Sequence, residues 1–197
     1  MKKRLVIVFV VLFLALCLGR FIWFNEKYPD VTRMYYGQGE FVPLEKDVVY
    51  IDQMDGYEVR VNGAQVMYLE DFFQKYSVTE EQKAELYEGY MVPPEALYDI
   101  TITLKNVDNT ETGISFADWV IQSDDIWCDF HDVLYRIANP GVDTSHVALR
   151  TGSEMEFHLI YNLREERFLP EVWQNIQSYP MWITITCYPV KKMIDLN

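Results

Sequence analysis

Five side chains that could bind a metal ion crowd one short stretch of the chain. They are Asp124, Asp125, Asp129, His131 and Asp132. Carboxylate oxygens are hard ligands of the kind that Ca²⁺ prefers, so the four aspartates are the calcium candidates of this sequence. Their spacing matches no EF-hand loop, and a solvated acidic loop accounts for the same residues without a metal. We favour the solvated loop and predict no metal site.

Nothing else in the sequence has the pattern of a catalytic or cofactor-binding motif. It contains no GxSxG, HExxH or CxxC motif and no glycine-rich phosphate loop. The three histidines, His131, His146 and His158, are far apart in the sequence. His158 is predicted on the solvent-facing side of a strand beside Glu154 and Glu156, where a solvated sheet face is favoured over a metal site. We therefore predict no catalytic residue and no cofactor.

Four tryptophans offer aromatic surfaces on which a sugar ring could stack. They are Trp119, Trp127, Trp173 and Trp182. Large aromatic side chains pack in protein cores more often than they bind ligands, and we favour core packing for most of them. The chain has 30 acidic residues, so a pair of carboxylates suited to glycoside hydrolysis is always available and carries no signal.

Two cysteines, Cys128 and Cys187, remain beyond the N-terminal segment, and each is predicted on the apolar side of a strand. A disulfide between them would fit an oxidising compartment. Two buried thiols fit equally with the pattern, because unpaired cysteine is among the most buried residue types. We favour the two thiols and keep the bridge as the alternative.

These side chains would be positioned mainly by β-strands. Residues 98–106 alternate apolar and polar side chains and are the clearest predicted strand, with one face buried. Residues 57–61 alternate in the same way and are followed by Asn62-Gly63, a strong signal for a two-residue hairpin. Residues 64–69 would then return as the partner strand.

Further strands and short helices follow from local signals. Thr79 and Gln82 have the spacing of a capping box at the start of a helix that ends near Gly89. Residues 126–138 predict a short strand that passes into a helix, and Pro170 suits the first turn of another. The remaining strands are predicted at 114–122, with a bulge near Asp118, at 146–163 as two strands joined at 151–153, and at 181–189.

The N-terminus predicts a membrane segment. Leu5 to Phe24 is 20 residues long and is interrupted only by Arg20, and a helix of that length spans roughly 30 Å, the thickness of a hydrocarbon core. Lys2 to Arg4 favour a cytoplasmic N-terminus by the positive-inside rule. We favour an uncleaved signal anchor over a cleaved signal peptide with secretion, and both over a lipoprotein signal at Cys17. The resulting organisation is an anchor at 1–24, a juxtamembrane linker at 25–39 and one domain at 40–197.

The charge excludes a class of partner. The chain has 17 basic and 30 acidic residues. Four of the basic residues and none of the acidic ones precede Glu26, so the rest of the chain carries 13 bases against 30 acids, a net charge of −17. A body this acidic repels phosphate backbones, and we exclude nucleic-acid binding.

The element pattern predicts an all-β fold. We count about seven to nine short strands, at most three short helices and no βαβ rhythm, which favours a β-sandwich. Several segments in this region are similar to a known type of module. They are Ile102-Thr-Leu-Lys-Asn106 with the polar turn after it, Gly113-Ile-Ser-Phe116, and Leu149-Arg-Thr-Gly-Ser-Glu154 leading into Met155-Glu-Phe-His-Leu-Ile160. This stretch resembles telokin-like, immunoglobulin-like modules of bacterial lipoproteins and anchored surface proteins.

With the basic, apolar N-terminus and the closing Tyr188-Pro189, nearly the whole chain is similar to an uncharacterised family of single-span bacterial proteins, a domain of unknown function. The lipobox of many telokin-like proteins is absent here. The resemblance implies an immunoglobulin-like sandwich with two or three short helices, outside the membrane, and it carries over no catalytic residue.

We therefore predict a membrane-anchored, extracytoplasmic immunoglobulin-like domain. Its expected role is a binding or interaction module, with an extracytoplasmic protein or a wall ligand as partner. The alternative is a small cell-envelope hydrolase that acts on wall polymers.

Overall fold

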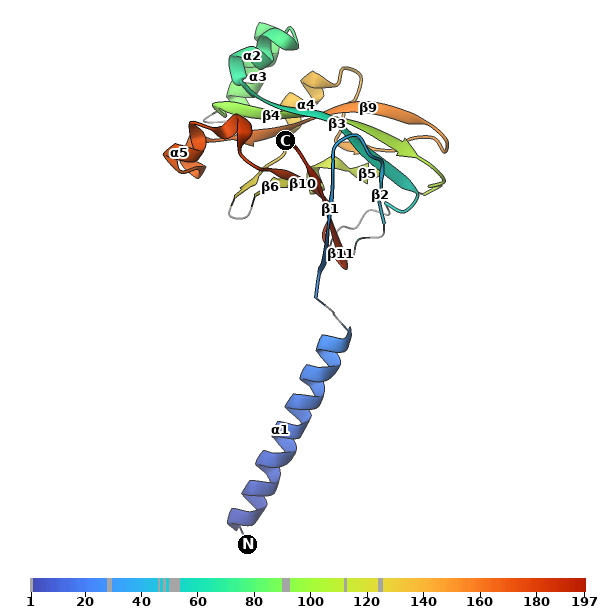
Figure 1. Cartoon of the computed structure of the whole chain (residues 1–197), viewed down its shortest axis with the longest axis vertical. Helices are drawn as coiled ribbons and strands as arrows, with labels where there is room; N and C mark the ends of the chain where they lie inside the picture. Colours follow the sequence, from blue (N-terminus) through green and yellow to red (C-terminus); the bar gives the residue numbers. More distant parts are fainter. Residues whose placement is uncertain are drawn as a thin grey trace. The chain divides into compact units, whose positions relative to one another are not determined.

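The computed structural model describes residues 2–27, 30–45, 47, 49, 54–89, 93–111, 113–123 and 126–197 (Figure 1). The chain divides into two compact units, Met1–Val31 and Thr32–Asn197. Asp124 and Asp125, two of the four calcium candidates, lie outside the described residues.

The first unit contains one helix, α1 (Lys2–Lys27). Its segment Phe9–Lys27 has a mean hydropathy of 1.7, and none of it is buried inside the protein. Such a helix is compatible with a membrane anchor or a signal sequence. It continues three residues past Phe24, where the sequence predicted its end.

A five-stranded sheet forms one part of the second unit. Its strand order is β1 (Thr32–Tyr36), β11 (Val190–Asp195), β10 (Trp182–Thr186), β6 (Val120–Gln122) and β7 (Trp127–Cys128). The β1–β11 pair is parallel and the other pairs are antiparallel. Strand β1 lies in the segment predicted as an irregular linker, so the sheet begins earlier in the chain than expected.

A four-stranded antiparallel sheet forms the second part. It contains β2 (Val42–Pro43), β3 (Tyr57–Tyr68), β4 (Ala96–Asn106) and β9 (Glu154–Leu163), in that order. A small third sheet pairs β5 (Ile114–Ser115) with β8 (His146–Val147).

The two larger sheets share one hydrophobic core. Most of the apolar side chains that alternate with polar ones in β4, β9 and β10 are fully buried in a single cluster, among them Ile102, Phe157, Leu159, Ile183 and Ile185. The alternation of the sequence therefore predicted the buried face of β4, β9 and β10 correctly. Met155 continues the same alternation but is 44% exposed, because it lies near the start of β9.

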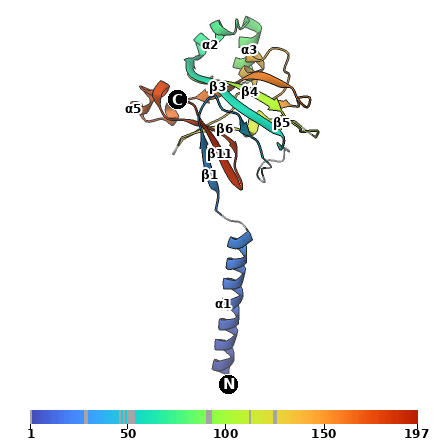
Figure 2. The same cartoon turned by 45° about the vertical axis from the view of Figure 1, so that its right-hand side comes forward.

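The outer face of the four-stranded sheet is covered at one end by helices (Figure 2). These are α2 (Leu69–Lys75), α3 (Glu80–Gly89) and α4 (Asp132–Ala138), whose apolar side chains form a second cluster with Leu97 and Ile160. The sequence predicted a fully solvated face here. The capping box at the start of α3 is confirmed, because Thr79 N donates to Gln82 Oε1 (2.9 Å) and Gln82 N to Thr79 Oγ1 (3.3 Å).

The all-β prediction is only partly confirmed. Strands hold 35% of the residues and helices 32%, because α1 is long and four more helices and three 3-10 turns lie between strands. The remaining helix is α5 (Pro170–Trp173), which begins at the predicted proline. The 3-10 turns are η1 (Phe116–Asp118), η2 (Glu165–Arg167) and η3 (Ile176–Ser178).

The predicted hairpin at Asn62-Gly63 is wrong. Strand β3 runs straight through this dipeptide and pairs with β4 on both sides of it, with a register shift between Val61 and Gly63. The Asn62 amide nitrogen donates to Thr103 Oγ1 (2.9 Å) and Glu156 Oε2 (3.1 Å). These bonds to β4 and to β9, the strand beyond it, stabilise a bulge where local preference favours a turn.

Two other strand predictions also differ from the structure. The segment 114–122 forms two strands, β5 and β6, because η1 interrupts it at the position of the predicted bulge. In the segment 146–163, β8 pairs with β5 and β9 with β4, so the two strands do not form a hairpin.

Candidate functional site

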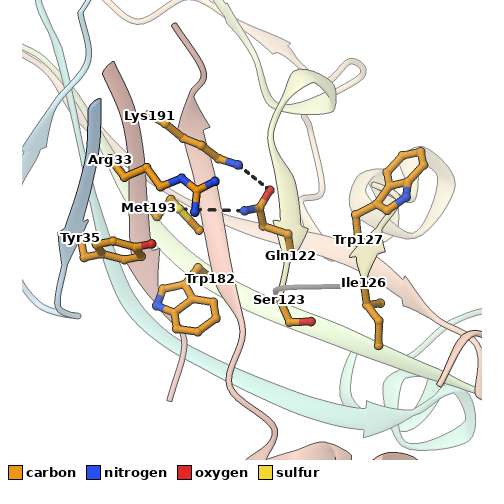
Figure 3. A pocket seen from close by; sticks show the side chains of 9 residues that line it. All are labelled: Arg33, Tyr35, Gln122, Ser123, Ile126, Trp127, Trp182, Lys191 and Met193. Carbon is orange, nitrogen blue, oxygen red and sulfur yellow. Dashed lines mark hydrogen bonds between the residues drawn. The ribbon is translucent and has the colours of Figure 1, made fainter. Parts of the chain in front are cut away.

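A groove of about 320 Å³ lies on one face of the five-stranded sheet (Figure 3). Its lining residues come from β1, β11, β10 and β7, and from the end of β6 with the loop that follows it. The strands of a sheet lie about 4.8 Å apart, so the two outermost of five strands are separated by roughly 19 Å. The lining residues therefore span the full width of the sheet.

Two basic side chains lie next to each other in this groove. Arg33 on β1 and Lys191 on β11 are direct partners in the parallel register. Lys191 Nζ donates to Gln122 Oε1 (3.0 Å), and among the described residues the Arg33 guanidinium has no hydrogen bond or ion pair. Figure 3 shows both cationic groups pointing toward Gln122. No described acidic side chain lines the groove.

Aromatic side chains form the other part of the lining. The ring edge of Tyr35 packs against Trp182, with 6.3 Å between ring centroids and 71° between planes. Trp127 lies at the opposite edge of the sheet and is 61% exposed. Ser123 adds a hydroxyl beside these rings. The groove therefore combines apolar ring surfaces, hydrogen-bonding groups and positive charge.

Strand alternation explains why these residues share one face. Lys191 and Met193 point into the groove, whereas Lys192 and Ile194 between and after them are buried on the other side. The Lys192 ammonium is buried but donates to Pro43 O (2.6 Å) and lies 3.3 Å from Glu45 Oε1. Strand β1 pairs with the outer side of β11, so Lys191 lies inside the sheet and not at its edge.

A second polar site lies under helix α2 on the outer face of the four-stranded sheet. The carboxylate of Asp99 is fully buried and accepts from Lys75 Nζ (2.7 Å), Tyr76 OH (2.7 Å) and His158 Nδ1 (3.0 Å). Thr101 Oγ1 lies 3.4 Å from the same ring nitrogen of His158. Asp99 and Thr101 also line a shallow hollow of about 270 Å³. His158, predicted on a solvated face, is therefore partly buried in this cluster.

Hydrogen bonding dominates the electrostatics of the Asp99 cluster. Burial by itself raises the pKa of Asp99, but the bonds from His158, Lys75 and Tyr76 outweigh it and lower the pKa to about 2. Burial, followed by the bond to Asp99, raises the pKa of Tyr76. Because Lys75 and Tyr76 follow one another at the end of α2, the buried carboxylate fastens that helix to the sheet.

Each of the two calcium candidates that the structure describes, Asp129 and Asp132, forms an ion pair with an arginine. Asp129 Oδ2 lies 3.1 Å from Arg167 Nη1, and Asp132 Oδ2 lies 3.3 Å from Arg136 Nε. Within the described ranges, no three His, Cys, Asp or Glu side chains gather in a way that could hold a metal. His131, from the same stretch, is buried and caps α4 by accepting from Leu134 N (3.4 Å). Burial lowers the pKa of His131 to about 4.

The cysteines and tryptophans predicted to be buried are distributed over several environments. Cys128 is buried, which raises the pKa of its thiol to about 12, and Cys187 is half-buried. No disulfide joins these two residues, both of which the structure describes. Trp119 is fully buried and Trp173 packs partly buried against the core, as favoured, but Trp127 and Trp182 line the groove.

Sequence reasoning missed the groove as a unit. It named Trp127 and Trp182 only as two of four tryptophans, and it did not single out Arg33, Tyr35 or Gln122. The one available signal was the alternation around Trp182 and Lys191, which places both on the face opposite the core.

Comparison with known proteins identifies the family of this chain. Residues 33–192 match a family described as a domain of unknown function (DUF5028). No curated protein and no solved structure matches the chain. The matched segment begins at Arg33 and includes Lys191, so it contains both basic residues of the groove.

Proposed function

The chain belongs to the DUF5028 family, and from that premise we propose that it is a membrane-anchored module that binds a ligand outside the cytoplasm. The single observation that carries the binding role is the groove on the five-stranded sheet. A concave site lined by aromatic rings and a few polar or charged groups is the usual form of a ligand site.

The proposed location rests on the N-terminus. The apolar helix α1 carries Lys2, Lys3 and Arg4 at its start and no acid before Glu26. This asymmetry favours a cytoplasmic N-terminus with the second unit on the far side of the membrane. Cleavage and secretion would place the second unit in the same compartment without the anchor.

We also propose a specific fold type for the second unit. Two sheets that share one core, most of whose strand pairs are antiparallel, support an immunoglobulin-like, telokin-like sandwich of a bacterial surface protein. The resemblance of residues 102–160 supports the same assignment.

A photocrosslinking experiment in native membranes tests the binding role. In the full-length protein, Trp127→p-benzoylphenylalanine places the probe at the groove, and Tyr87→p-benzoylphenylalanine on α3 is the control because Tyr87 is 47% exposed and does not line the groove. We expect a defined adduct at Trp127 that is lost with Arg33→Gln and is absent at Tyr87. The same adducts at both positions, or none at Trp127, would reject the proposal.

One observation favours the second candidate, a cell-envelope hydrolase. The Asp99 cluster unites a carboxylate, a histidine, a tyrosine and a lysine beside the hollow that Thr101 lines. Asp99, Tyr76 and Thr101 all approach the same nitrogen, His158 Nδ1. In a catalytic relay the histidine is the base, and the carboxylate that orients it and the nucleophile that it activates contact different ring nitrogens, so we rank this candidate second. Hydrolysis of a wall polymer that is lost with His158→Gln in a correctly folded protein would reverse the ranking.

A further inference from the structure

We infer that the groove binds an acidic saccharide, with a carboxylate of the sugar chain held by Arg33 and Lys191 and a sugar ring stacked on an exposed indole. This inference rests on the proposed function, because it names the ligand class of the same groove. It is drawn from the charge, the aromatic surfaces and the extent of the groove.

The charge of the described lining residues is opposite to that of the protein. The whole chain has a net charge of −13, yet two cations face each other across the β1–β11 pair. Like charges directly opposite in a sheet are destabilising. The lysine is bound only to the neutral amide of Gln122 among the described residues, which leaves two of its three donors available. An anion placed beside Arg33 would remove this repulsion and accept from both residues.

On the same face of β11, Asp195 is the next acidic side chain. Its Oδ1 accepts from Asn197 N (3.1 Å), and it does not line the groove. The cations therefore lack an acidic partner among the described lining residues.

The remaining lining identifies the class of anion. A simple phosphate or carboxylate would use the two cations and leave Trp182, Trp127 and Tyr35 without a role. The apolar face of a sugar ring packs on an indole, while its hydroxyls need planar amide and hydroxyl partners such as Gln122 and Ser123. The lining residues come from all five strands of the sheet, so a ligand that contacts both ends of the lining is longer than a single small anion. This favours a chain of sugars.

A membrane surface is the competing partner, since tryptophan and basic residues also bind anionic lipids. The amide of Gln122 and the hydroxyl of Ser123 lie within the groove between Arg33 and Trp127 (Figure 3). Hydrogen-bonding groups recessed between the rings suit the hydroxyls of a saccharide better than acyl chains. We therefore favour an acidic saccharide over an anionic lipid surface, and the experiment below distinguishes the two ligands.

The test uses the full-length protein in a neutral detergent and titrates it with matched probes. The first probe is an oligogalacturonate, the second is its fully methyl-esterified form, and the third is inorganic phosphate. The fourth is phosphatidylglycerol in mixed micelles with the same detergent. We expect the acidic oligosaccharide to bind in a salt-dependent manner, and its ester and phosphate at least about tenfold more weakly.

Single substitutions assign the binding to the groove. We expect Arg33→Gln and Lys191→Gln each to weaken oligogalacturonate binding roughly tenfold, and Trp127→Ala to weaken it by a similar factor. Trp127 is exposed, so its removal leaves the core intact. Arg150→Gln makes the same charge change at an exposed position outside the groove and should leave binding within about twofold of wild type.

Each other outcome overturns the inference. If oligogalacturonate and its methyl ester bind equally well, the two cations do not recognise a carboxylate. If phosphate binds as well as oligogalacturonate, stacking of a sugar ring on an indole does not contribute to binding. Binding of phosphatidylglycerol that is lost with Arg33→Gln, without binding of any saccharide, assigns the groove to lipid. If no saccharide binds while the Trp127 adduct still depends on Arg33, the inference fails and the proposed function stands. If the adduct is also missing, both fail.

Discussion

Arg33 and Lys191 are direct partners in the parallel strand pair β1–β11, two positive charges side by side in a protein of net charge −13. Within the described part of the chain, neither forms an ion pair. Two adjacent like charges lower the stability of a strand pair, and the same two charges can both donate to one bound anion.

Because the two positive charges repel each other, we predict that reversing one of them stabilises the ligand-free protein. Arg33→Glu should raise the free energy of unfolding by about 0.2–1 kcal/mol at low salt, because repulsion is replaced by attraction across the same register. The gain should shrink in high salt. Chemical denaturation of the full-length protein at two ionic strengths measures it, with Arg150→Glu as the control. A lower free energy of unfolding for Arg33→Glu would show that other groups in the folded protein already offset the repulsion between the two cations.

A second prediction concerns the shared core. Ile102→Ala and Ile183→Ala should each cost about 2–5 kcal/mol, since both side chains are fully buried between the two large sheets. Glu154→Ala, exposed on the opposite face of β9, should change stability by only about 0.5 kcal/mol. Thermal or denaturant unfolding decides this. Equal effects of the two kinds of substitution would mean that the strand faces are assigned wrongly.

The Asp99 cluster predicts a specific acid dependence. The pKa of Asp99 is lowered in the folded protein from 3.8 to about 2, so its bonds contribute stability above the unfolded pKa and lose it as pH falls from about 4 to 2. A shift of this size corresponds to roughly 2 kcal/mol. Asp99→Asn should unfold more easily at pH 7 and lose less stability between pH 4 and pH 2 than wild type. If the free energy of unfolding falls equally between pH 4 and pH 2 in Asp99→Asn and in wild type, the acid dependence does not arise from Asp99.

Calcium should not stabilise the protein. The described candidates Asp129 and Asp132 are each paired with an arginine, which an incoming cation would have to displace. Millimolar Ca²⁺ or its chelation should leave Tm unchanged, as followed by differential scanning calorimetry. A clear rise in Tm that disappears with Asp129→Asn would revive the calcium site.

The anchor prediction follows from the apolar run that continues beyond Arg20. The mature protein should retain Met1-Lys-Lys-Arg4 and sediment with membranes in its native cell. Mass spectrometry of the membrane fraction and of the medium checks this. Recovery of chains that begin near Arg20 from the medium would identify α1 as a cleaved signal sequence.

Local patterns in the sequence determined much of this fold. The apolar side chains of β4, β9 and β10 alternate with period two, so their buried face follows from neighbouring residues alone. The cap formed by Thr79 and Gln82 is likewise a contact between residues three positions apart. The apolar run of α1 needs no tertiary partner to be recognised.

The tertiary structure decided which strands and side chains meet. Asn62-Gly63 favours a hairpin locally, but the long strand β4 offers partners on both sides and the chain continues straight. Asp99 is buried only because α2 brings Lys75 and Tyr76 over it. Arg33 and Lys191 become neighbours only when the first strand of the sheet adds in parallel beside the last. Pairing between distant segments depends on the free energy of the whole fold, which no local period of residues encodes.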